Sequence, residues 1–349
     1  LNLGQVFYYI NRKFFPKTIS VTHGDVHLRE GLKLRYSGLK KYTNHETDKF
    51  TFINKSICFD SNDMDWNNSE LSRLWLYNLH YFDYLFGGFS SKSCIKLIHD
   101  WIRKNPAGSN NSWDPFPISL RIVNWLKFSS IKNIDQPDLL TMADSIAAQA
   151  SWLIKHLEYH LLGNHLFKNG KALIFAGLFF QGEEAKKWLE KGIQIIGNQI
   201  DEQVLFDGGH FERSPMYHSM ILEDCLDILN LASTQSHGYL DRLVPRIKKA
   251  SEKMVRFLFL MCHPDGMISL FNDSALGIEA EPAQLANYYT KITGNQIVPE
   301  KIGAVALPHT GYYILAPEAK NKMIIDCGPI GPDYQPGHAH CDTLSFELS

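Results

Sequence analysis

The chain has 349 residues, of which 44% are hydrophobic and 21% are charged, and these are the proportions of an ordinary globular protein. Its 35 basic and 37 acidic residues give a formal net charge of −2, which argues against a general nucleic-acid binder but allows an acidic sugar held by a few local cations. No run of eighteen apolar residues occurs, so we expect no transmembrane helix.

Residues 1–65 are predicted to form an N-terminal arm. The first fifteen residues are aromatic, are interrupted by Asn11, Arg12 and Lys13, and show no signal-peptide core followed by a small-residue cleavage site. The rest of the arm is polar and irregular, with a strand-like run at 50–53. The cysteines of the chain lack any C-x-x-C spacing and are predicted to be buried thiols rather than a disulfide framework or a zinc ribbon: Cys58, Cys94, Cys225, Cys262, Cys327 and Cys341.

Residues 66–300 are predicted to form a helical domain. From about residue 71 the apolar residues recur at intervals of three and four, the period of a helix with one buried face. Gly87 and Gly88 end the first helix, and short turns with Pro, Gly or Asn separate the others, so hairpins of antiparallel helices in a stack or a ring are expected. The other predicted helices span 92–104, 117–130, 137–161, 165–181, 183–199, 214–233 and 240–262.

Residues 301–349 are predicted to begin a β-domain. Short apolar runs at 304–307, 311–315 and 323–326 are separated by Pro, Gly and Asn, a pattern typical of antiparallel strands. Apolar and polar residues alternate again over 344–348. A half-buried last strand needs a partner, so we expect the β-domain to continue beyond this segment; a sheet completed by earlier strands is the alternative.

Three segments hold most of the residues suited to chemistry. The first is Gly163–Lys171, which places Asn164, His165, Lys168 and Lys171 at the start of a predicted helix, where free backbone N–H groups favour an anion. The alternative interpretation is structural: Asn164 is a helix N-cap and His165 is a surface residue of the first turn.

The second segment is Asp207–His218. Its Ser214-Pro215 pair is typical of an N-cap followed by the first helical residue. If the helix begins at Arg213, that cation shares a face with Tyr217 and favours the phenolate, so that Tyr217 acts as a base. The alternative is that Tyr217 is an ordinary core or rim residue.

The third segment is Gln335–Asp342, with an H-x-H pair. Alternate residues of a strand point to one face, so His338 and His340 are predicted to be neighbours there. Such pairs commonly bind zinc, and Asp342 offers an oxygen ligand, although no third ligand is obvious. Two further groups have structural defaults: His156 and His160 as a solvated helix end, and Asp273 as a turn residue.

In this order, the three segments resemble the heparinase II/III family of polysaccharide lyases, which is related to alginate lyases of the same architecture. The likeness runs from about residue 66 to the end and includes the motifs at 75–82 and 119–125. It implies a mainly α fold, an incomplete (α/α) toroid of helical hairpins followed by the start of an antiparallel β-sandwich domain. The resemblance also implies cleavage of an acidic, uronate-containing polysaccharide by β-elimination, in the periplasm or outside the cell; a cytoplasmic location stays open.

The resemblance implies a role for each matching residue. Asn164 and His165 are expected to neutralise the uronate carboxylate, and Tyr217 to act as proton donor and as a candidate base. His338 is expected as the base or its assistant. No cofactor is required for this chemistry. Some members of the family bind a structural zinc through the histidine that matches His340, with further ligands later in the β-domain, so His340 is a candidate zinc ligand.

Other expectations are less specific. Arg121, Lys168, Lys171 and Arg213 are candidates for binding substrate charges. Neither a nucleic-acid partner nor a membrane span is expected. Two other functions stay open: a glycoside hydrolase on the same toroid, with Asp207, Glu212 or Asp273 as its carboxylates, and a non-catalytic protein that binds acidic polysaccharide.

Overall fold

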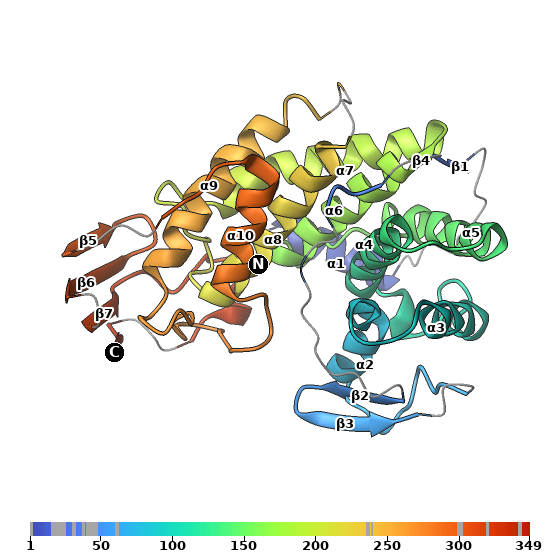
Figure 1. Cartoon of the computed structure of the whole chain (residues 1–349), viewed down its shortest axis with the longest axis horizontal. Helices are drawn as coiled ribbons and strands as arrows, with labels where there is room; N and C mark the ends of the chain where they lie inside the picture. Colours follow the sequence, from blue (N-terminus) through green and yellow to red (C-terminus); the bar gives the residue numbers. More distant parts are fainter. Residues whose placement is uncertain are drawn as a thin grey trace. The chain divides into compact units, whose positions relative to one another are not determined.

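A computed structural model shows the chain as two compact units, which Figure 1 traces from blue to red. The N-terminal unit holds Tyr8–Tyr159 and Lys168–Gln194, and the C-terminal unit holds Leu1–Phe7, His160–Phe167 and Ile195–Ser349, each as far as its residues are described. The structure describes residues 3–14, 26–29, 33–36, 39, 48–59, 63–234, 238, 240–298, 303–318, 321–340 and 344–349.

The N-terminal unit is built from helices whose ends follow local signals. Ser72 caps α2, since its hydroxyl accepts a hydrogen bond from the Trp75 N–H at 3.2 Å, and Phe82 ends the helix in a left-handed conformation. Its α-helices and 3-10 helices are α2 (Arg73–Tyr81), η1 (Asp83–Phe86), α3 (Ser91–Lys104), η2 (Asn111–Trp113), α4 (Pro115–Ile131) and α5 (Gln136–Leu153). Two small antiparallel pairs join them: β1 (His27–Leu28) with β4 (Phe180–Gln181), and β2 (Lys49–Phe52) with β3 (Lys55–Cys58).

The helix predicted over 137–161 is too long. It ends at Leu153, and the Glu158 N–H donates instead to the Asn169 side-chain oxygen at 2.9 Å. Because that amide is bonded to a side chain, it is not available to a helical carbonyl four residues back. The predicted extension of this helix to residue 161 was therefore wrong, because apolar periodicity does not show where a backbone N–H finds a side-chain partner.

Helices also dominate the C-terminal unit, and three of the described helices have residues in both units. They are α1 (Leu3–Phe14), α6 (Gly163–Phe179) and α7 (Glu183–Gln203). Two helices were not predicted: α1 (Leu3–Phe14) and α10 (Pro282–Thr293), although a capping box of Glu281 with Gln284 marks the start of α10. The remaining helices are α8 (Pro215–Ala232), α9 (Val244–Leu260) and the 3-10 turn η3 (Pro336–His338).

The predicted β-structure near the C-terminus is confirmed. Four antiparallel strands lie in the order β5 (Ala304–Leu307), β6 (Tyr312–Glu318), β7 (Asn321–Asp326) and β8 (Phe346–Leu348). Residues on one face of the sheet pack with Phe271 and with residues of α9 and its C-cap in a buried cluster: Leu307, Tyr312, Ile314, Ile324, Phe257 and Met261. Alternation along the strands is what directs these side chains to one face.

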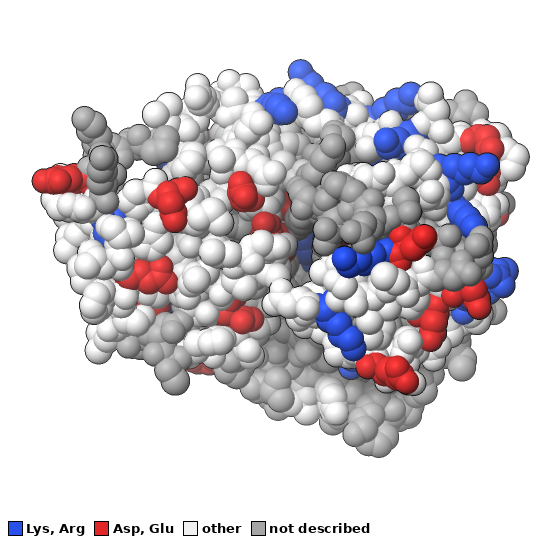
Figure 2. Space-filling view, turned by 60° about the horizontal axis from the view of Figure 1, so that its bottom comes forward, with Lys and Arg blue, Asp and Glu red and all other residues white. Residues whose placement is uncertain are grey.

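The cysteine prediction is right for three described residues and wrong for two. Cys94, Cys225 and Cys262 are buried, whereas Cys58 and Cys327 are exposed. Within the described ranges, no helix is long and apolar enough to cross a membrane. On the face drawn in Figure 2, basic and acidic side chains form small separate patches, in line with the near-neutral net charge.

Candidate active site

Tyr217 lies in the first turn of α8. As predicted, Ser214 is the N-cap, accepting a hydrogen bond from the Tyr217 N–H at 3.2 Å, and Pro215 is the first helical residue. A second bond, from the Ser214 hydroxyl to the Asp273 carbonyl at 3.0 Å, ties the cap to the loop that carries Asp273. The Tyr217 side chain is 9% exposed, so the phenol is held in a largely buried environment.

His338 lies directly against Tyr217, although 121 residues separate them in the chain. The two rings stack with centroids 4.2 Å apart, and the phenol oxygen is 3.0 Å from His338 Nε2. On the other side of the imidazole, Nδ1 is 2.5 Å from a carboxylate oxygen of Glu212, a residue that is 3% exposed. A carboxylate can only accept, so Nδ1 carries the proton and Nε2 faces the phenol.

Asp273 gives the phenol a second partner. Its Oδ2 atom lies 3.3 Å from the Tyr217 hydroxyl, and its Oδ1 atom lies 3.5 Å from His340 Nε2. When His338 is neutral, the phenol can donate to Nε2; when His338 is protonated, Nε2 donates and the phenol proton turns to Asp273. The arrangement can therefore hold a proton on the Tyr217 hydroxyl or on His338 Nε2.

The charges around the pair set its protonation. Burial raises the pKa of Tyr217, and the negative charges of Asp273 and Glu212 raise it further. Burial by itself lowers the pKa of His338, but its hydrogen bond to Glu212 and the charges of Glu212 and Asp273 outweigh burial and raise that pKa. Tyr217 is therefore a neutral hydroxyl near pH 7, and His338 is a strengthened base.

The predicted influence of Arg213 on Tyr217 was wrong. Arg213 precedes the helix in a left-handed conformation (φ 59°), and its guanidinium donates to the Thr310 and Phe211 carbonyls at 2.8 and 3.0 Å. It anchors the loop to the turn before β6, and the carboxylates beside the phenol raise the pKa of Tyr217 instead of lowering it. Such carbonyl bonds favour a structural role for Arg213 over substrate contact.

The strand expected around the H-x-H pair is absent. Residues 336–338 form the 3-10 turn η3, so His338 and His340 do not alternate along a strand. His340 is exposed and has Asp273 as its partner, while Cys341 and Asp342 lie outside the described residues. Among the described residues, no group of three or more His, Cys, Asp or Glu side chains could hold a metal, and the structural zinc expected at His340 stays a prediction.

Asn164 lies just inside the start of α6, in the C-terminal unit with Tyr217 and His338. The helix begins at Gly163, so the N-cap interpretation of Asn164 was wrong. Leu162 and Gly163 have positive φ angles of 63° and 52°, and these angles form a tight turn that leads directly into the helix. Asn164 is 3% exposed; its Oδ1 atom is buried without a hydrogen-bond partner, and its Nδ2 atom donates only weakly, to the Met220 sulfur at 3.8 Å.

The other predicted site residues are placed less favourably. His165 follows Asn164 and is half-buried, whereas Lys168 is buried and belongs to the N-terminal unit. Arg121, also in that unit, is fully buried: it donates to Gln149, the His80 carbonyl and the Ser112 carbonyl at 2.8–3.2 Å and lies 3.8 Å over the Trp101 ring. Arg121 is thus a core residue, and its burial argues against substrate contact.

His156 and Asp207 both make structural contacts, and the solvated helix end predicted for His156 was wrong, because α5 ends at Leu153. His156 is part-buried and stacks on Trp152 with ring centroids 4.1 Å apart. Asp207 accepts hydrogen bonds from the Thr310 N–H, the Thr310 hydroxyl and the His309 N–H at 2.8–3.0 Å, so its carboxylate holds a turn.

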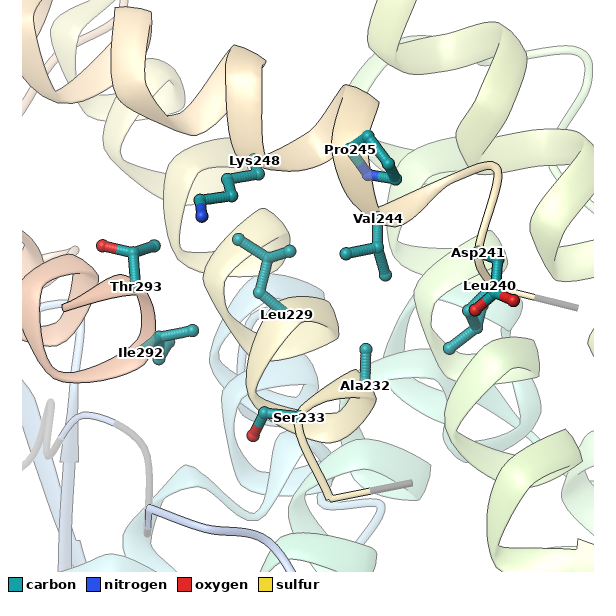
Figure 3. Close-up of a pocket in the computed structure, with 10 residues that line it drawn as sticks. All are labelled: Leu229, Ala232, Ser233, Leu240, Asp241, Val244, Pro245, Lys248, Ile292 and Thr293. Atoms are coloured by element: carbon teal, nitrogen blue, oxygen red, sulfur yellow. The ribbon is translucent and has the colours of Figure 1, made fainter. Parts of the chain in front are cut away.

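A cavity of about 470 Å³ lies elsewhere in the C-terminal unit, between the C-terminal ends of α8 and α10 and the start of α9 (Figure 3). Its walls are mostly aliphatic, including Leu229, Val244 and Ile292, with Lys248 and Asp241 near its edge. None of the predicted site residues lines this cavity. The candidate active site is therefore defined by the Tyr217 cluster and not by this pocket.

Comparison with known proteins agrees with the geometry. The family model described as "Heparinase II/III N-terminus" matches residues 8–297, and "Heparinase II/III-like, C-terminal" matches residues 300–349. Together these two matches cover most of this mainly helical chain. The chain belongs to the heparinase II/III family.

Relatives and solved structures fit this assignment. The chain is 26% identical over 284 residues to a heparin-sulfate lyase of Pedobacter heparinus. The aligned region covers 74% of this chain and 42% of that protein. It is 27% identical over 284 residues to FtsZ-localized protein C of Caulobacter vibrioides, covering 75% of this chain and 44% of that protein. The chain thus spans less than half the length of these curated relatives.

A crystal structure of heparinase III superposes on 99% of this chain and 60% of its own length, with a TM-score of 0.68 and 20% sequence identity. A heparan sulfate lyase from Pedobacter heparinus superposes on 86% of this chain and 52% of its own, with a TM-score of 0.58 and 21% identity. The predicted fold class, a helical toroid followed by the start of an antiparallel β-domain, is confirmed. The domain boundaries predicted at residues 65 and 300 stay a prediction.

Sequence reasoning missed how two carboxylates are used. Glu212 and Asp273 were considered only as hydrolase carboxylates or turn residues, yet they flank His338 and Tyr217. The segment around Glu212 offered a signal, since a carboxylate five residues before a candidate tyrosine is close to it whenever the intervening loop is tight. No local signal pointed from Asp273 to Tyr217.

Proposed function

We propose that the protein is a polysaccharide lyase that cleaves uronic-acid-containing polysaccharide, of the heparan sulfate type, by β-elimination. The observation that carries the proposal is the Tyr217 hydroxyl placed 3.0 Å from His338 Nε2, with Glu212 fixing the imidazole from the far side. An acid and a base side by side are what an elimination requires. The similarity to heparin-sulfate lyases supports this substrate class.

Asn164 and His165 are proposed to neutralise the uronate carboxylate. The C5 proton of a uronate is too weakly acidic to leave while the adjacent carboxylate keeps its full charge, so donors that bind the developing enolate lower the barrier. The Asn164 amide suits this role, because it is buried and its Nδ2 donor has only a thioether at 3.8 Å, a weak acceptor that a carboxylate can displace. His165 follows it in the same helical turn.

The elimination is proposed to move two protons in opposite directions. His338 Nε2 takes the C5 proton, the C5–H electron pair forms the C4–C5 double bond, and the C4–O4 bond breaks with its electrons passing to O4. The Tyr217 hydroxyl then protonates O4. The raised pKa of Tyr217 keeps its proton available, and the raised pKa of His338 strengthens the base.

The two alternative functions have less support. A hydrolase needs two carboxylates facing the sugar, but Asp207 is bonded to the turn at residues 309–310 and Glu212 is bonded to His338. A purely binding protein has no need of a buried phenol stacked on an imidazole with a strengthened base. FtsZ-localized protein C shows that a relative of similar identity has a different name, so the assay must include chain shortening and not binding alone.

The test is incubation of the full-length protein with heparan sulfate, heparosan, chondroitin, alginate and hyaluronan, followed by ultraviolet absorbance of the unsaturated ends. We expect absorbance to rise with at least one polymer, and to be lost in Tyr217→Phe. Shorter chains without absorbance would establish hydrolysis, and saturable binding without shortening would establish a binding protein. The proposed chemistry needs no metal, and a polymeric substrate is consistent with a periplasmic or secreted location.

A further inference from the structure

The last turn of α7 makes contacts with each segment that carries a candidate catalytic residue. This turn, from Gln199 to Gln203, lies wholly in the C-terminal unit. It is bonded to the turn before Asn164, to the loop before Glu212 and to the loop before His338. The proposed mechanism uses none of its residues directly.

Gln203 links the first two of these segments. Its side chain is fully buried, and its Nε2 atom donates to the Gly163 carbonyl at 2.9 Å and to the Gln199 side-chain oxygen at 2.7 Å. Because both donors are used in this way, the Oε1 atom faces His210 Nε2 at 3.0 Å and must accept. His210 therefore carries its proton on Nε2, and since burial lowers the pKa of His210, the ring stays neutral and the bond persists.

Glu202 and Gly163 link the third segment to the other two. The Tyr334 hydroxyl donates to one Glu202 carboxylate oxygen, and Gln199 donates to the other at 2.7 Å. Tyr334 lies four residues before His338, so this bond holds the loop that delivers the imidazole. The next residue, Gln335, packs against Gly163 so closely that a Cβ there would lie 2.5 Å from its side-chain amide.

We propose that Gln203 is a positioning residue for Asn164 and for the Glu212–His338 pair, with Glu202 as its companion; this inference rests on the proposed function. The buried Gln203 amide fixes the position of the Gly163 carbonyl, and therefore the start of the helix that carries Asn164. The same amide fixes His210, which lies two residues before Glu212. Catalytic groups must be held to within a fraction of an ångström, and misplacement far from the chemistry can cost about 10²-fold in rate.

The test compares Gln203→Met with Gln194→Met in the full-length protein. Methionine keeps the length of glutamine and removes its hydrogen bonds, and Gln194 is an exposed residue of the same helix, bonded to Lys191. For Gln203→Met we expect kcat to fall about 10- to 100-fold with KM changed less than about threefold, because the misplaced groups act on transition-state charge.

Amide hydrogen exchange supplies a readout that does not need activity. In Gln203→Met, exchange should accelerate in peptides covering 160–167 and 332–340, and Gln194→Met should leave them unchanged. Parent-like kcat together with parent-like exchange in these peptides would overturn the inference while leaving the lyase proposal intact. A parent protein inactive on every uronate polymer would instead refute the lyase proposal, and exchange would still decide whether Gln203 holds these segments.

Discussion

Replacing Glu212 by Gln tests the electrostatic core of the proposed mechanism. The substitution keeps the shape of the side chain and an oxygen that can accept from His338 Nδ1, but it removes the charge 2.5 Å from that atom. Since Glu212 opposes the effect of burial and raises the pKa of His338, its neutral replacement should lower that pKa. The imidazole would then be a weaker base in nearly its original orientation.

Two quantities should change. The ascending limb of kcat/KM against pH reports the base of the free enzyme, so it should move to lower pH in Glu212→Gln, while the maximal rate should fall by about 10², the lower end of a general-base contribution. Loss of a charge-assisted hydrogen bond at a residue that is 3% exposed should also reduce the free energy of unfolding by roughly 1.5–3 kcal/mol.

Stability should depend on pH in a defined direction. The folded-state pKa of His338 is raised, so the stabilisation from its pair with Glu212 is fully present below the unfolded-state pKa and is lost as pH rises through the folded-state pKa. Chemical unfolding of the parent and of Glu212→Gln at a series of pH values from 5 to 9 measures this difference. A pH limb that stays in place or moves to higher pH in the variant would refute the assigned role of Glu212.

Three further substitutions separate chemistry from folding. Tyr217→Phe should lower kcat by about 10²–10⁴ in the absorbance assay with an almost unchanged melting temperature, and parent-like turnover would exclude Tyr217 as the acid. Asn164→Ala should lower kcat by about 10²–10³ as one lost donor to developing charge, whereas a rise in KM alone would assign it to ground-state binding. Arg121→Met should reduce the free energy of unfolding by roughly 3 kcal/mol or more, because three bonded acceptors lose their donor, while the folded variant keeps its kcat. Selective loss of activity in that variant, without loss of stability, would restore a substrate role for Arg121.

Local signals in the sequence determined the helical domain, the change to strands near residue 303 and the start of α8. A 3.6-residue period, a Ser-Pro pair and short apolar runs act over a few residues, so they can be read without a fold. They also marked the segments that carry Asn164, Tyr217 and His338. They failed where the partner is distant, as when the Asn169 side chain accepts the Glu158 N–H that the helix predicted over 137–161 would bond four residues back.

Only the tertiary structure decided how these residues are used. The stacking of Tyr217 on His338 joins positions 121 residues apart, and no local pattern specifies which oxygen faces which nitrogen. Burial and neighbouring carboxylates reversed the pKa shift that sequence spacing predicted for Tyr217, and burial turned Arg121 from a substrate candidate into a core residue. Protonation depends on solvent exclusion and on charges brought together by the fold, and both are properties of three-dimensional packing that residue order alone does not fix.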